Sequence, residues 1–479
     1  MGLAKRPARS ARPRPALAEP AARPAALALL RALSPLYARA ALRLDSLELR
    51  HGERLIRAFA GFQKGESRLI LAFRHAYGDE PQLLSYLFDV LLPREARRLG
   101  LALPRRPHAR FVHGYEVPLW SGELVRWLLP RVGALPVYHV RFDAASVERL
   151  RAAMLDAEGP LALAPEGQIS YRSETLPRIE KGAARLAFWC AEDLARSGRA
   201  QSVSILPISL HYRYDESGIG ELERLAGRLE GACGLAAPPP APRPASPDGR
   251  RAALKSRILR IEAALLGLAE SYYGLGRPAS PDGEDWEAAG REERDERRGR
   301  LLEAALSRGE AMLGLAPPAG PAEVADRIGR VYRIRQEGWD RIYPTSPLGA
   351  MGELERALAD RRAGEAWYAM RHMELVDLGH YLDSGYLEGG AAGPAGAPSF
   401  GRLVEAAYSL ADLASRLVGG DISDRPNLLR KRAVVVVAPP LDMGARYADY
   451  KANRKAAVDA ATGELEKAYL ACIEEYLHE

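Results

Sequence analysis

The sequence predicts an α/β fold in which a mixed, mostly parallel sheet is flanked by helices, together with a large and mainly helical region. Short apolar runs at 68–73, 160–164 and 202–212 have the length of buried strands, and stretches with helical spacing separate them. From about residue 215 to 430, proline and glycine punctuate a charged and largely helical pattern. A β-branched run at 433–437 then indicates one more buried strand.

The individual elements follow from hydrophobic spacing and from boundary residues. Residues 25–60 have two amphipathic helical patterns, which the pair Ser34-Pro35 separates. Strands are expected at 68–73, 111–115, 137–140, 160–164, 202–212 and 433–437, and helices at 82–92, 117–130, 144–156, 181–196, 401–418 and 456–476.

Two tryptophans, Trp120 and Trp127, lie in the helix expected at 117–130. They are separated by two helical turns, which places both indole rings on one face. That face can pack into the core, or it can dip into the headgroup layer of a membrane, where tryptophan is enriched.

Length and composition indicate a globular protein that works in a reducing compartment. The 479 residues exceed a typical single domain, and a hydrophobic content of 47% excludes a disordered chain. Cys190, Cys233 and Cys472 are scattered and odd in number, so neither a disulfide framework nor a metal cluster is expected. No apolar window reaches about 18 residues, so no membrane-spanning helix is expected.

The chain carries a mild net charge of +6. This charge suits contact with anionic lipid, an acidic carrier protein or the phosphates of coenzyme A, although it also serves solubility alone. The lack of zinc-finger spacing, RNA-binding signatures and basic-aromatic alternation argues against nucleic acid as a partner. Residues 1–24 are basic and rich in proline and alanine, which predicts a disordered tail or, alternatively, a tether to anionic lipid.

The first candidate for chemistry is the stretch Leu69-Ile-Leu-Ala-Phe-Arg-His-Ala-Tyr-Gly-Asp-Glu80. Its apolar run stops at His75, and Asp79 and Glu80 follow closely. A carboxylate can bind one imidazole nitrogen and fix the tautomer, which leaves the other nitrogen to remove a proton from an alcohol. A histidine beside a carboxylate is also common as a surface or capping pair, so these residues alone do not establish a general base.

A second apolar run, Leu161-Ala-Leu-Ala, ends at Pro165-Glu166-Gly167. It is followed by Ile179-Glu-Lys181-Gly182, which opens a helical pattern. When helices connect parallel strands, the polar groups at the strand ends meet at one edge of the sheet. Glu166 and His75 are therefore expected to lie near each other.

These motifs resemble those of the glycerophospholipid acyltransferase family, whose members acylate lysophosphatidic acid and glycerol-3-phosphate. That family has a His-four-residues-Asp block, a Gly…Arg block, a Pro-Glu-Gly block and a later Val-Pro-type strand. The matching stretches occur here in the same order, as His75 to Glu80, Gly133-Ala-Leu-Pro-Val-Tyr-His139, Pro165-Glu166-Gly167 and Ile205-Leu206-Pro207-Ile208.

The first block departs from the family pattern at two places. Glu80 stands at the four-residue spacing and Asp79 at the three-residue spacing, so either carboxylate can orient His75. Arg74 precedes the histidine where the family usually has Asn.

The later blocks depart at their arginine positions. His139 stands where an arginine is expected, with Arg141 two residues beyond it. Gln168-Ile169-Ser170 follows Gly167 where the family usually has Thr-Arg-Ser, and Arg172 comes after it. Arginines hold phosphate through bidentate contacts, so their displacement leaves the head group of the acceptor open.

The resemblance implies an O-acyltransferase that moves a fatty acyl group from an acyl-CoA or acyl-carrier-protein thioester to a hydroxyl of a glycerol-phosphate or lysophospholipid-like acceptor. No further cofactor is implied. His75 would be the general base, oriented by Asp79 or Glu80. The residues expected to bind substrate are Glu166, Gly167, Ser170, Arg141, Arg172 and Lys181. The expected location is cytoplasmic, with peripheral attachment to the anionic inner face of the membrane.

The resemblance also implies a domain map, because the family's domain ends with a strand, a proline-containing turn and a helix. Residues 25–215 and 431–479 would form one acyltransferase core, 216–430 a helical insertion, and 1–24 the basic tail. The alternatives are an acyltransferase for an acceptor without phosphate, or a non-catalytic lipid- or carrier-binding protein, which would not need the His75–carboxylate pair. A serine hydrolase is disfavoured because the chain has no Gly-x-Ser-x-Gly elbow.

Overall fold

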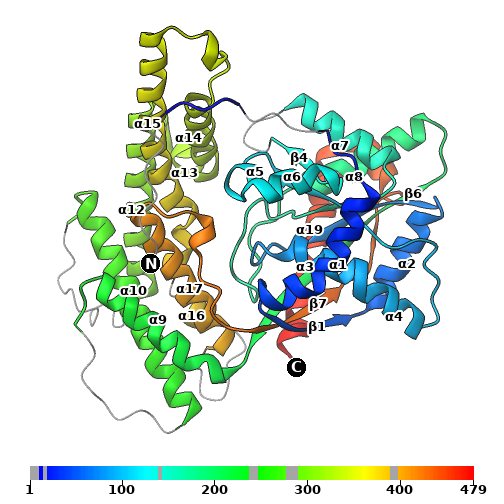
Figure 1. The fold of residues 1–479 in the computed structure, drawn as a ribbon, viewed down its shortest axis with the longest axis horizontal. Coiled ribbons are helices and arrows are strands. Elements are labelled where there is room, and N and C mark those ends of the chain that lie inside the picture. The colour runs from blue at the N-terminus through cyan, green and yellow to red at the C-terminus, as the bar shows by residue number, and fades with distance from the viewer. Residues whose placement is uncertain are drawn as a thin grey trace. The chain divides into compact units, whose positions relative to one another are not determined.

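A computed structural model describes residues 10–14, 19–138, 143–236, 246–276, 290–383, 385–388 and 398–478. The chain forms two compact units. The first, which we call the sheet unit, comprises Leu17–Asp215 and Leu429–Glu479. The second, the helical unit, comprises Met1–Ala16 and Glu216–Leu428 (Figure 1).

The sheet unit is built on a mixed, mostly parallel sheet, which confirms the expected α/β class. Its strands among the described residues are β1 (Leu44–Arg50), β2 (Ser67–Phe73), β3 (Arg110–Gly114), β4 (Leu135–Val137), β5 (Leu161–Leu163), β6 (Ser202–Tyr214), β7 (Lys431–Val437) and β8 (Leu441–Asp442). They lie in the order β1-β7-β6-β2-β5-β3-β4, and β8 pairs with β6. The pairings of β6 with β7 and β8 are antiparallel, and the other pairings are parallel.

Helices cover both faces of this sheet (Figure 1). Because successive strand residues point to opposite faces, Leu69 and Leu71 of β2 join one core while Ile70 and Ala72 join the other. The first core is closed by α1 (Pro24–Ala40), α2 (Gly52–Gln63), α3 (Glu80–Tyr86) and α4 (Leu92–Arg98). The second is closed by α7 (Ala144–Asp156), α8 (Gly182–Arg196), α18 (Tyr447–Ala452) and α19 (Arg454–Leu477).

The strand expected at 433–437 is β7, and it lies inside the sheet that leads to His75, as predicted. It pairs in parallel with β1 and in antiparallel fashion with β6. Its residues from Ala433 to Val437 are fully buried. Tyr214 is the register partner of Lys431, so the chain leaves β6 and enters β7 at neighbouring strand ends.

The prediction of two helices over residues 25–60 is wrong. Helix α1 runs through Pro35, and β1 and α2 follow it. A proline lacks the N–H that would bond the carbonyl four residues earlier. Here that carbonyl, of Arg31, accepts a hydrogen bond from Ser34 Oγ at 3.2 Å, so the helix continues. β1 was missed because a register shift between Leu44 and Ser46 interrupts its alternation.

The prediction of a single helix at 117–130 is also wrong, because the segment forms two helices. α5 (Val117–Trp120) and α6 (Glu123–Arg131) are separated at Gly122, whose φ of 88° lies in the left-handed region. Trp120 and Trp127 therefore do not share one helical face. Trp127 is exposed, and the side chain of Trp120 lies outside the part that the structure describes.

The helical unit contains only helices and loops in its described residues, as expected for 216–430. Its main helices are α9 (Ile219–Ala232), α10 (Pro247–Tyr272), α12 (Arg291–Met312), α14 (Arg327–Ile342), α15 (Glu353–Asp377) and α17 (Phe400–Leu417), with the shorter α13 (Pro321–Ala325) and α16 (Gly385–Glu388). None of the described helices in either unit is long and apolar enough to cross a bilayer.

Part of the N-terminal segment is ordered on the helical unit. The Ala11 N–H donates to Asp360 at 2.7 Å, and Arg14 pairs with Asp340 at 2.6 Å. The disorder expected for residues 1–24 therefore does not extend to residues 10–14, nor to 19–24, where Ala21 N and Arg23 N donate to the carbonyls of Pro130 and Arg131. Residues 1–9 and 15–18 lie outside the described ranges.

Candidate functional site

His75 lies just beyond the end of β2 and is bound to a buried carboxylate. Its Nδ1 is 2.9 Å from Glu80 Oε2. The Glu80 side chain is fully buried, whereas that of His75 keeps 21% of its surface exposed. An imidazole that is partly exposed, and whose Nδ1 is bonded to a buried carboxylate, can accept a proton from a substrate at Nε2.

The turn between His75 and Glu80 holds the carboxylate in place. Tyr77 N donates to Glu80 Oε1 at 2.6 Å, and Gly78 N donates to Oε2 at 2.8 Å. Gly78 has a φ of 90°, which only glycine adopts readily. Since Glu80 accepts all of these bonds, the Nδ1 of His75 must donate, and Nε2 is left with its lone pair.

The pKa of His75 lies above its ordinary value. Burial by itself lowers this pKa, but the hydrogen bond and the charge of Glu80 raise it, with further contributions from Glu166 and Asp79. The carboxylate thus stabilises the imidazolium that forms when His75 accepts a proton.

Asp79 does not orient His75, which settles the choice that the sequence left open. It accepts a hydrogen bond from the Tyr212 hydroxyl at 2.6 Å and forms an ion pair with Lys431. The Lys431 ammonium also lies over the ring of Tyr212, 4.6 Å from its centroid. Burial and the two carboxylates raise the pKa of Tyr212 well above its ordinary value, so it remains a neutral donor. Asp79 therefore joins β7 to the turn between His75 and Glu80.

Arg74, whose role the sequence did not reveal, is a buried clamp. Its side chain has no exposed surface. It donates to the carbonyls of Ser173 at 2.8 Å and Arg172 at 3.1 Å, and to Glu166 Oε1 at 3.3 Å. A guanidinium can reach several acceptors at once because its five donors form a rigid fork. Arg74 thereby fixes the loop after β5 against the end of β2.

The Pro-Glu-Gly block lies next to His75, as the strand topology predicted. Glu166 Oε1 accepts the His75 N–H at 3.1 Å, and Ser170 N donates to the His75 carbonyl at 3.0 Å. Burial raises the pKa of Glu166, while Arg74 and the His75 N–H oppose that shift. The Glu166 side chain is fully buried, so its place in this geometry is to hold the loop.

The other residues expected to bind substrate have different surroundings. Gly167 is exposed, with a φ of 74°, and its N–H donates to the Ala164 carbonyl at 3.4 Å. Arg172 is half-buried and adjoins the carbonyl that Arg74 binds. Lys181 forms an ion pair with Asp459 of α19, not with a group of the His75 site. Arg141 and His139 lie outside the described residues.

Replacing Arg74 with methionine should destabilise the sheet unit strongly. The change leaves the buried Glu166 without its cation and leaves three carbonyls, those of Arg172, Ser173 and Thr175, without their donor. Breaking one side of a buried pair costs about 3–5 kcal/mol. The free energy of unfolding in urea measures this loss.

The matched control is Arg185→Met on the exposed side of α8, which should leave the unfolding midpoint unchanged. Arg74→Lys keeps the positive charge but loses the planar set of five donors, so its unfolding midpoint should lie between those of Arg74→Met and the wild type. Equal midpoints for Arg74→Met and the wild type would contradict the role of Arg74 as a clamp.

Comparisons with known proteins leave the site to be judged on its own geometry. The chain matched no protein-family model, no curated protein and no solved structure. Within the described ranges, no three His, Cys, Asp or Glu side chains are grouped so as to hold a metal ion. The assembly of His75, Glu80 and the loop that Arg74 holds is therefore the basis for assigning a function.

Proposed function

We propose that this chain is an O-acyltransferase that moves a fatty acyl group from a thioester to a hydroxyl of a glycerol-phosphate or lysophospholipid-like acceptor. The observation that carries the proposal is the pairing of a partly exposed His75 with the enclosed Glu80 at 2.9 Å. A structural histidine would not need a buried carboxylate that two backbone N–H groups also hold.

The reaction follows from this pair. Nε2 of His75 takes the proton of the acceptor hydroxyl, and the oxygen attacks the thioester carbonyl to form a tetrahedral intermediate. The intermediate then collapses to the ester, and the leaving thiolate receives the proton from the imidazolium. Before the reaction, Glu80 holds His75 in the tautomer that carries its proton on Nδ1. After proton transfer, Glu80 stabilises the imidazolium of His75.

The loop after β5 is the best candidate for stabilising the oxyanion. Ser170 N is bonded to the His75 carbonyl, so the turn from Gly167 to Ile169 lies beside the backbone of His75. Backbone N–H groups held rigidly beside a reacting carbonyl lower the barrier because the donors need no reorganisation. The clamp by Arg74 supports this role, since it fixes the loop from the inside.

The donor in this proposal is acyl-CoA or an acyl-carrier protein, and no other cofactor takes part. Arg172 and Arg141 are the proposed contacts to an acceptor phosphate. Lys181 is a weaker candidate because Asp459 already pairs with it. That pairing favours, as a second candidate, the same transfer to an acceptor without phosphate. Thioester consumption measured with a panel of lyso-lipids and polyols distinguishes the two, and consumption with none of them favours a non-catalytic binder.

Glu80→Gln should shift the pH dependence of the reaction as well as its rate. The neutral imidazole is the active form, so kcat/KM rises with pH through the pKa of His75. Glu80 holds this pKa above its ordinary value of 6.5. Removing the charge of Glu80 lowers the pKa of His75. The acidic limb of the plot of kcat/KM against pH should therefore move to lower pH, and the plateau value of kcat/KM should fall.

Asp79→Asn is the control for the pH experiment. Asp79 is a minor contributor to the pKa of His75, so its removal should move the limb much less. A limb that stays in place in Glu80→Gln would contradict His75 as the titrating base.

A further inference from the structure

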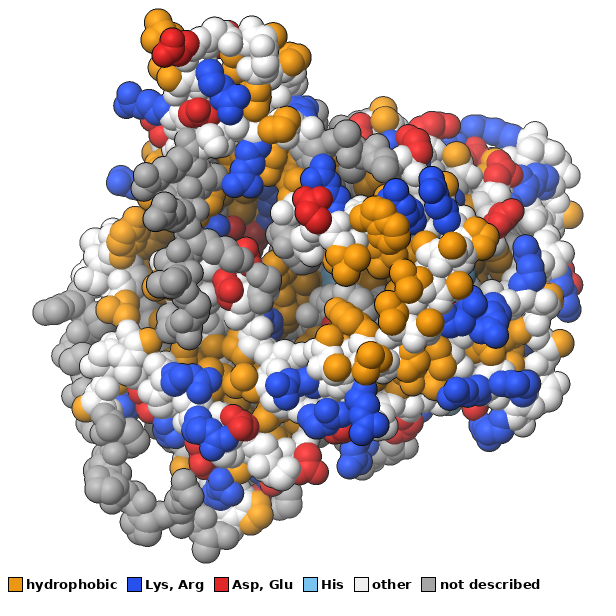
Figure 2. All heavy atoms as spheres, in the orientation of Figure 1, with side chains coloured by type: hydrophobic (Ala, Val, Ile, Leu, Met, Phe, Trp, Pro, Cys, Tyr) orange, Lys and Arg blue, Asp and Glu red, His pale blue; other side chains and the backbone are white. Residues whose placement is uncertain are grey.

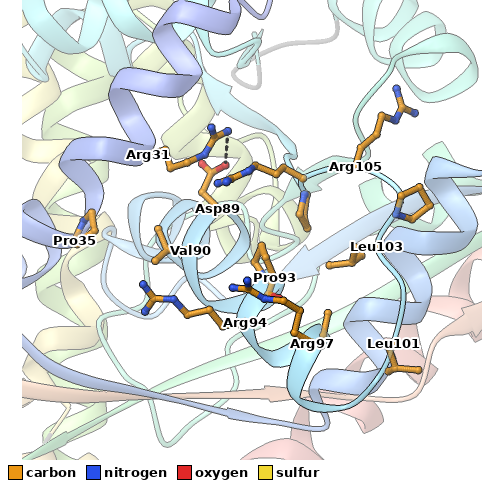
Figure 3. Close-up of a pocket in the computed structure, with 14 residues that line it drawn as sticks. Arg31, Pro35, Asp89, Val90, Pro93, Arg94, Arg97, Leu101, Leu103 and Arg105 are labelled. Atoms are coloured by element: carbon orange, nitrogen blue, oxygen red, sulfur yellow. Dashed lines mark hydrogen bonds and ion pairs between the residues drawn. The ribbon is translucent and has the colours of Figure 1, made fainter.

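A pocket in the sheet unit gathers five arginines around one acidic residue. Its volume is about 660 Å³, which is within the range of small-ligand sites. Its walls come from α1, the π-helical turn Leu87–Leu91, α4 and the loop 101–107. The charged lining residues are Arg31, Arg94, Arg97, Arg105, Arg106 and Asp89 (Figure 3). We call this cavity the arginine pocket.

Asp89 is built into the wall of the arginine pocket and is paired with Arg31. The Asp89 side chain is 2% exposed, and its Oδ1 lies 3.5 Å from Arg31 Nη2 (Figure 3). Burial raises its pKa, and the charges of His108, Arg31 and Arg106 oppose that shift. Because this carboxylate is enclosed and already paired, it leaves the other arginines of the pocket without an acidic partner.

Three arginines of the pocket carry uncompensated charge. Arg94, Arg97 and Arg106 form no ion pair with any residue that the structure describes. Elsewhere in the sheet unit arginines are paired, as Arg151 is with Asp193 at 2.6 Å. Figure 2 shows Lys and Arg side chains beside hydrophobic ones over this part of the sheet unit. Like charges gathered at one cavity repel one another, so the pocket favours an anion.

Apolar side chains form another part of the lining. Val90, Leu101 and Leu103 line the pocket, and the two leucines also pack against the core of the sheet unit. In the view of Figure 3, Leu101 and Leu103 lie on the opposite side of the pocket from the guanidinium groups of Arg31 and Arg94. The pocket therefore offers cations to one part of a ligand and a fixed apolar surface to another.

The arginine pocket is distinct from the His75 site. Neither His75 nor Glu80 lines it. The loop 101–107 is anchored to Gln63, since Arg105 N donates to Gln63 Oε1 at 2.9 Å and the Arg105 guanidinium donates to the Gln63 carbonyl at 3.4 Å. Gln63 ends α2 just before β2 begins, whereas His75 follows the other end of β2. The pocket is therefore free to hold a second molecule while the reaction proceeds.

We propose that the arginine pocket binds a soluble organic diphosphate of the size of a nucleoside diphosphate, at a site separate from that of His75. Guanidinium groups bind phosphate in bidentate fashion. One phosphate monoester carries a charge of about −1.5 to −2 at pH 7, so it cannot neutralise the three uncompensated arginines, whereas two linked phosphates can. The organic body of the ligand lies against Val90, Leu101 and Leu103. This inference does not depend on the chemistry of His75.

Isothermal titration calorimetry of the full-length protein tests this site with adenosine diphosphate (ADP), adenosine monophosphate and inorganic pyrophosphate. ADP should bind at one site per chain. The monophosphate should bind at least about tenfold more weakly, because it lacks one set of charge-assisted contacts. Pyrophosphate should also bind more weakly than ADP, because it has no organic body. Equal affinities for the monophosphate and ADP would overturn the requirement for two phosphates, and a lack of ADP binding would overturn the site.

Two double variants separate the pocket from general positive charge. Arg94→Gln/Arg97→Gln on α4 should weaken ADP binding by about a hundredfold, since each charge-assisted contact contributes about tenfold. The matched control is Arg39→Gln/Arg57→Gln, which removes the same charge from exposed positions of α1 and α2 that do not line the pocket. The control should bind ADP as the wild type does. Equal losses in the two double variants would mean diffuse charge attraction and would overturn the pocket as the site.

The variant Val90→Thr tests the apolar part of the pocket. It keeps the shape of the side chain but replaces a methyl group with a hydroxyl. ADP binding should weaken by about fourfold, the contribution of one buried methyl group. Pyrophosphate binding should not change, because pyrophosphate does not reach this surface. Equal weakening of both ligands would overturn the place assigned to the organic body.

A competition experiment separates this site from that of the proposed acyl donor, because coenzyme A also carries a nucleoside diphosphate. ADP should not compete with acyl-CoA in thioester consumption, and Arg94→Gln/Arg97→Gln should leave the KM for acyl-CoA unchanged. Competition together with a raised KM would assign the pocket to the donor and would overturn a separate site. His75→Ala should bind ADP as the wild type does, so a failure of the catalytic proposal would leave this result intact.

Discussion

Replacing His75 with alanine is expected to abolish the proposed acyl transfer while the fold persists. Loss of a general base lowers a rate by about 10²–10⁴. The side chain is partly exposed and lies at the end of a strand, so its removal costs little packing. Initial rates of thioester consumption, with circular dichroism to check folding, give the result.

A second His–Glu pair in the sheet unit provides a matched control. His51 Nε2 lies 3.0 Å from Glu475 Oε2. His51 has a φ of 56°, so His51→Asn is the suitable replacement because asparagine tolerates this region. This variant should keep the wild-type rate. Retention of more than about a tenth of the activity by His75→Ala would refute the base assignment, given the expected loss.

Truncating the chain after Asp215 is expected to unfold the sheet unit. The truncation removes β7, which lies between β1 and β6 and is fully buried from Ala433 to Val437. It also removes α19, whose Tyr469 hydroxyl donates to the Ala72 carbonyl of β2 at 2.9 Å. The remaining strands would expose unpaired edges and an uncovered face. A loss of the cooperative unfolding transition would show this effect.

Removing the helical unit instead should leave the sheet unit folded. Tyr214 and Lys431 are register partners in an antiparallel pair, so a short turn such as Asn-Gly can join the two strands. A variant in which Asn-Gly replaces 216–430 has only Asp215, Asn and Gly between the paired Tyr214 and Lys431. It should be soluble and should unfold cooperatively. For the truncation after Asp215, a stable and active 1–215 fragment would contradict the expected unfolding and would show that β7 is dispensable.

The sequence by itself determined the class of fold and the neighbourhood of the site. Buried parallel strands are short continuous apolar runs, so β2, β5 and β6 were recognisable, and the β-branched run of β7 required a buried position in a sheet. The order of these strands brings the ends of β2 and β5 together. The sequence therefore predicts that His75 and Glu166 lie near each other.

Predictions from hydrophobic spacing were wrong for two helical segments, each because of a single residue. Pro35 indicated a break, but the Ser34 hydroxyl satisfies the carbonyl that the proline leaves without a donor. The left-handed Gly122 divided a segment whose apolar spacing looked continuous. Both effects depend on single atoms, which hydrophobic periodicity does not record.

Only the tertiary structure decided which carboxylate serves His75 and what Arg74 does. Asp79 and Glu80 are adjacent, but the turn directs Glu80 inward to the imidazole, while Lys431 and Tyr212 bind Asp79 from distant parts of the chain. Arg74 meets its partners only because the loop after β5 folds over β2. Such contacts join residues far apart in sequence, so they arise from packing and not from local spacing.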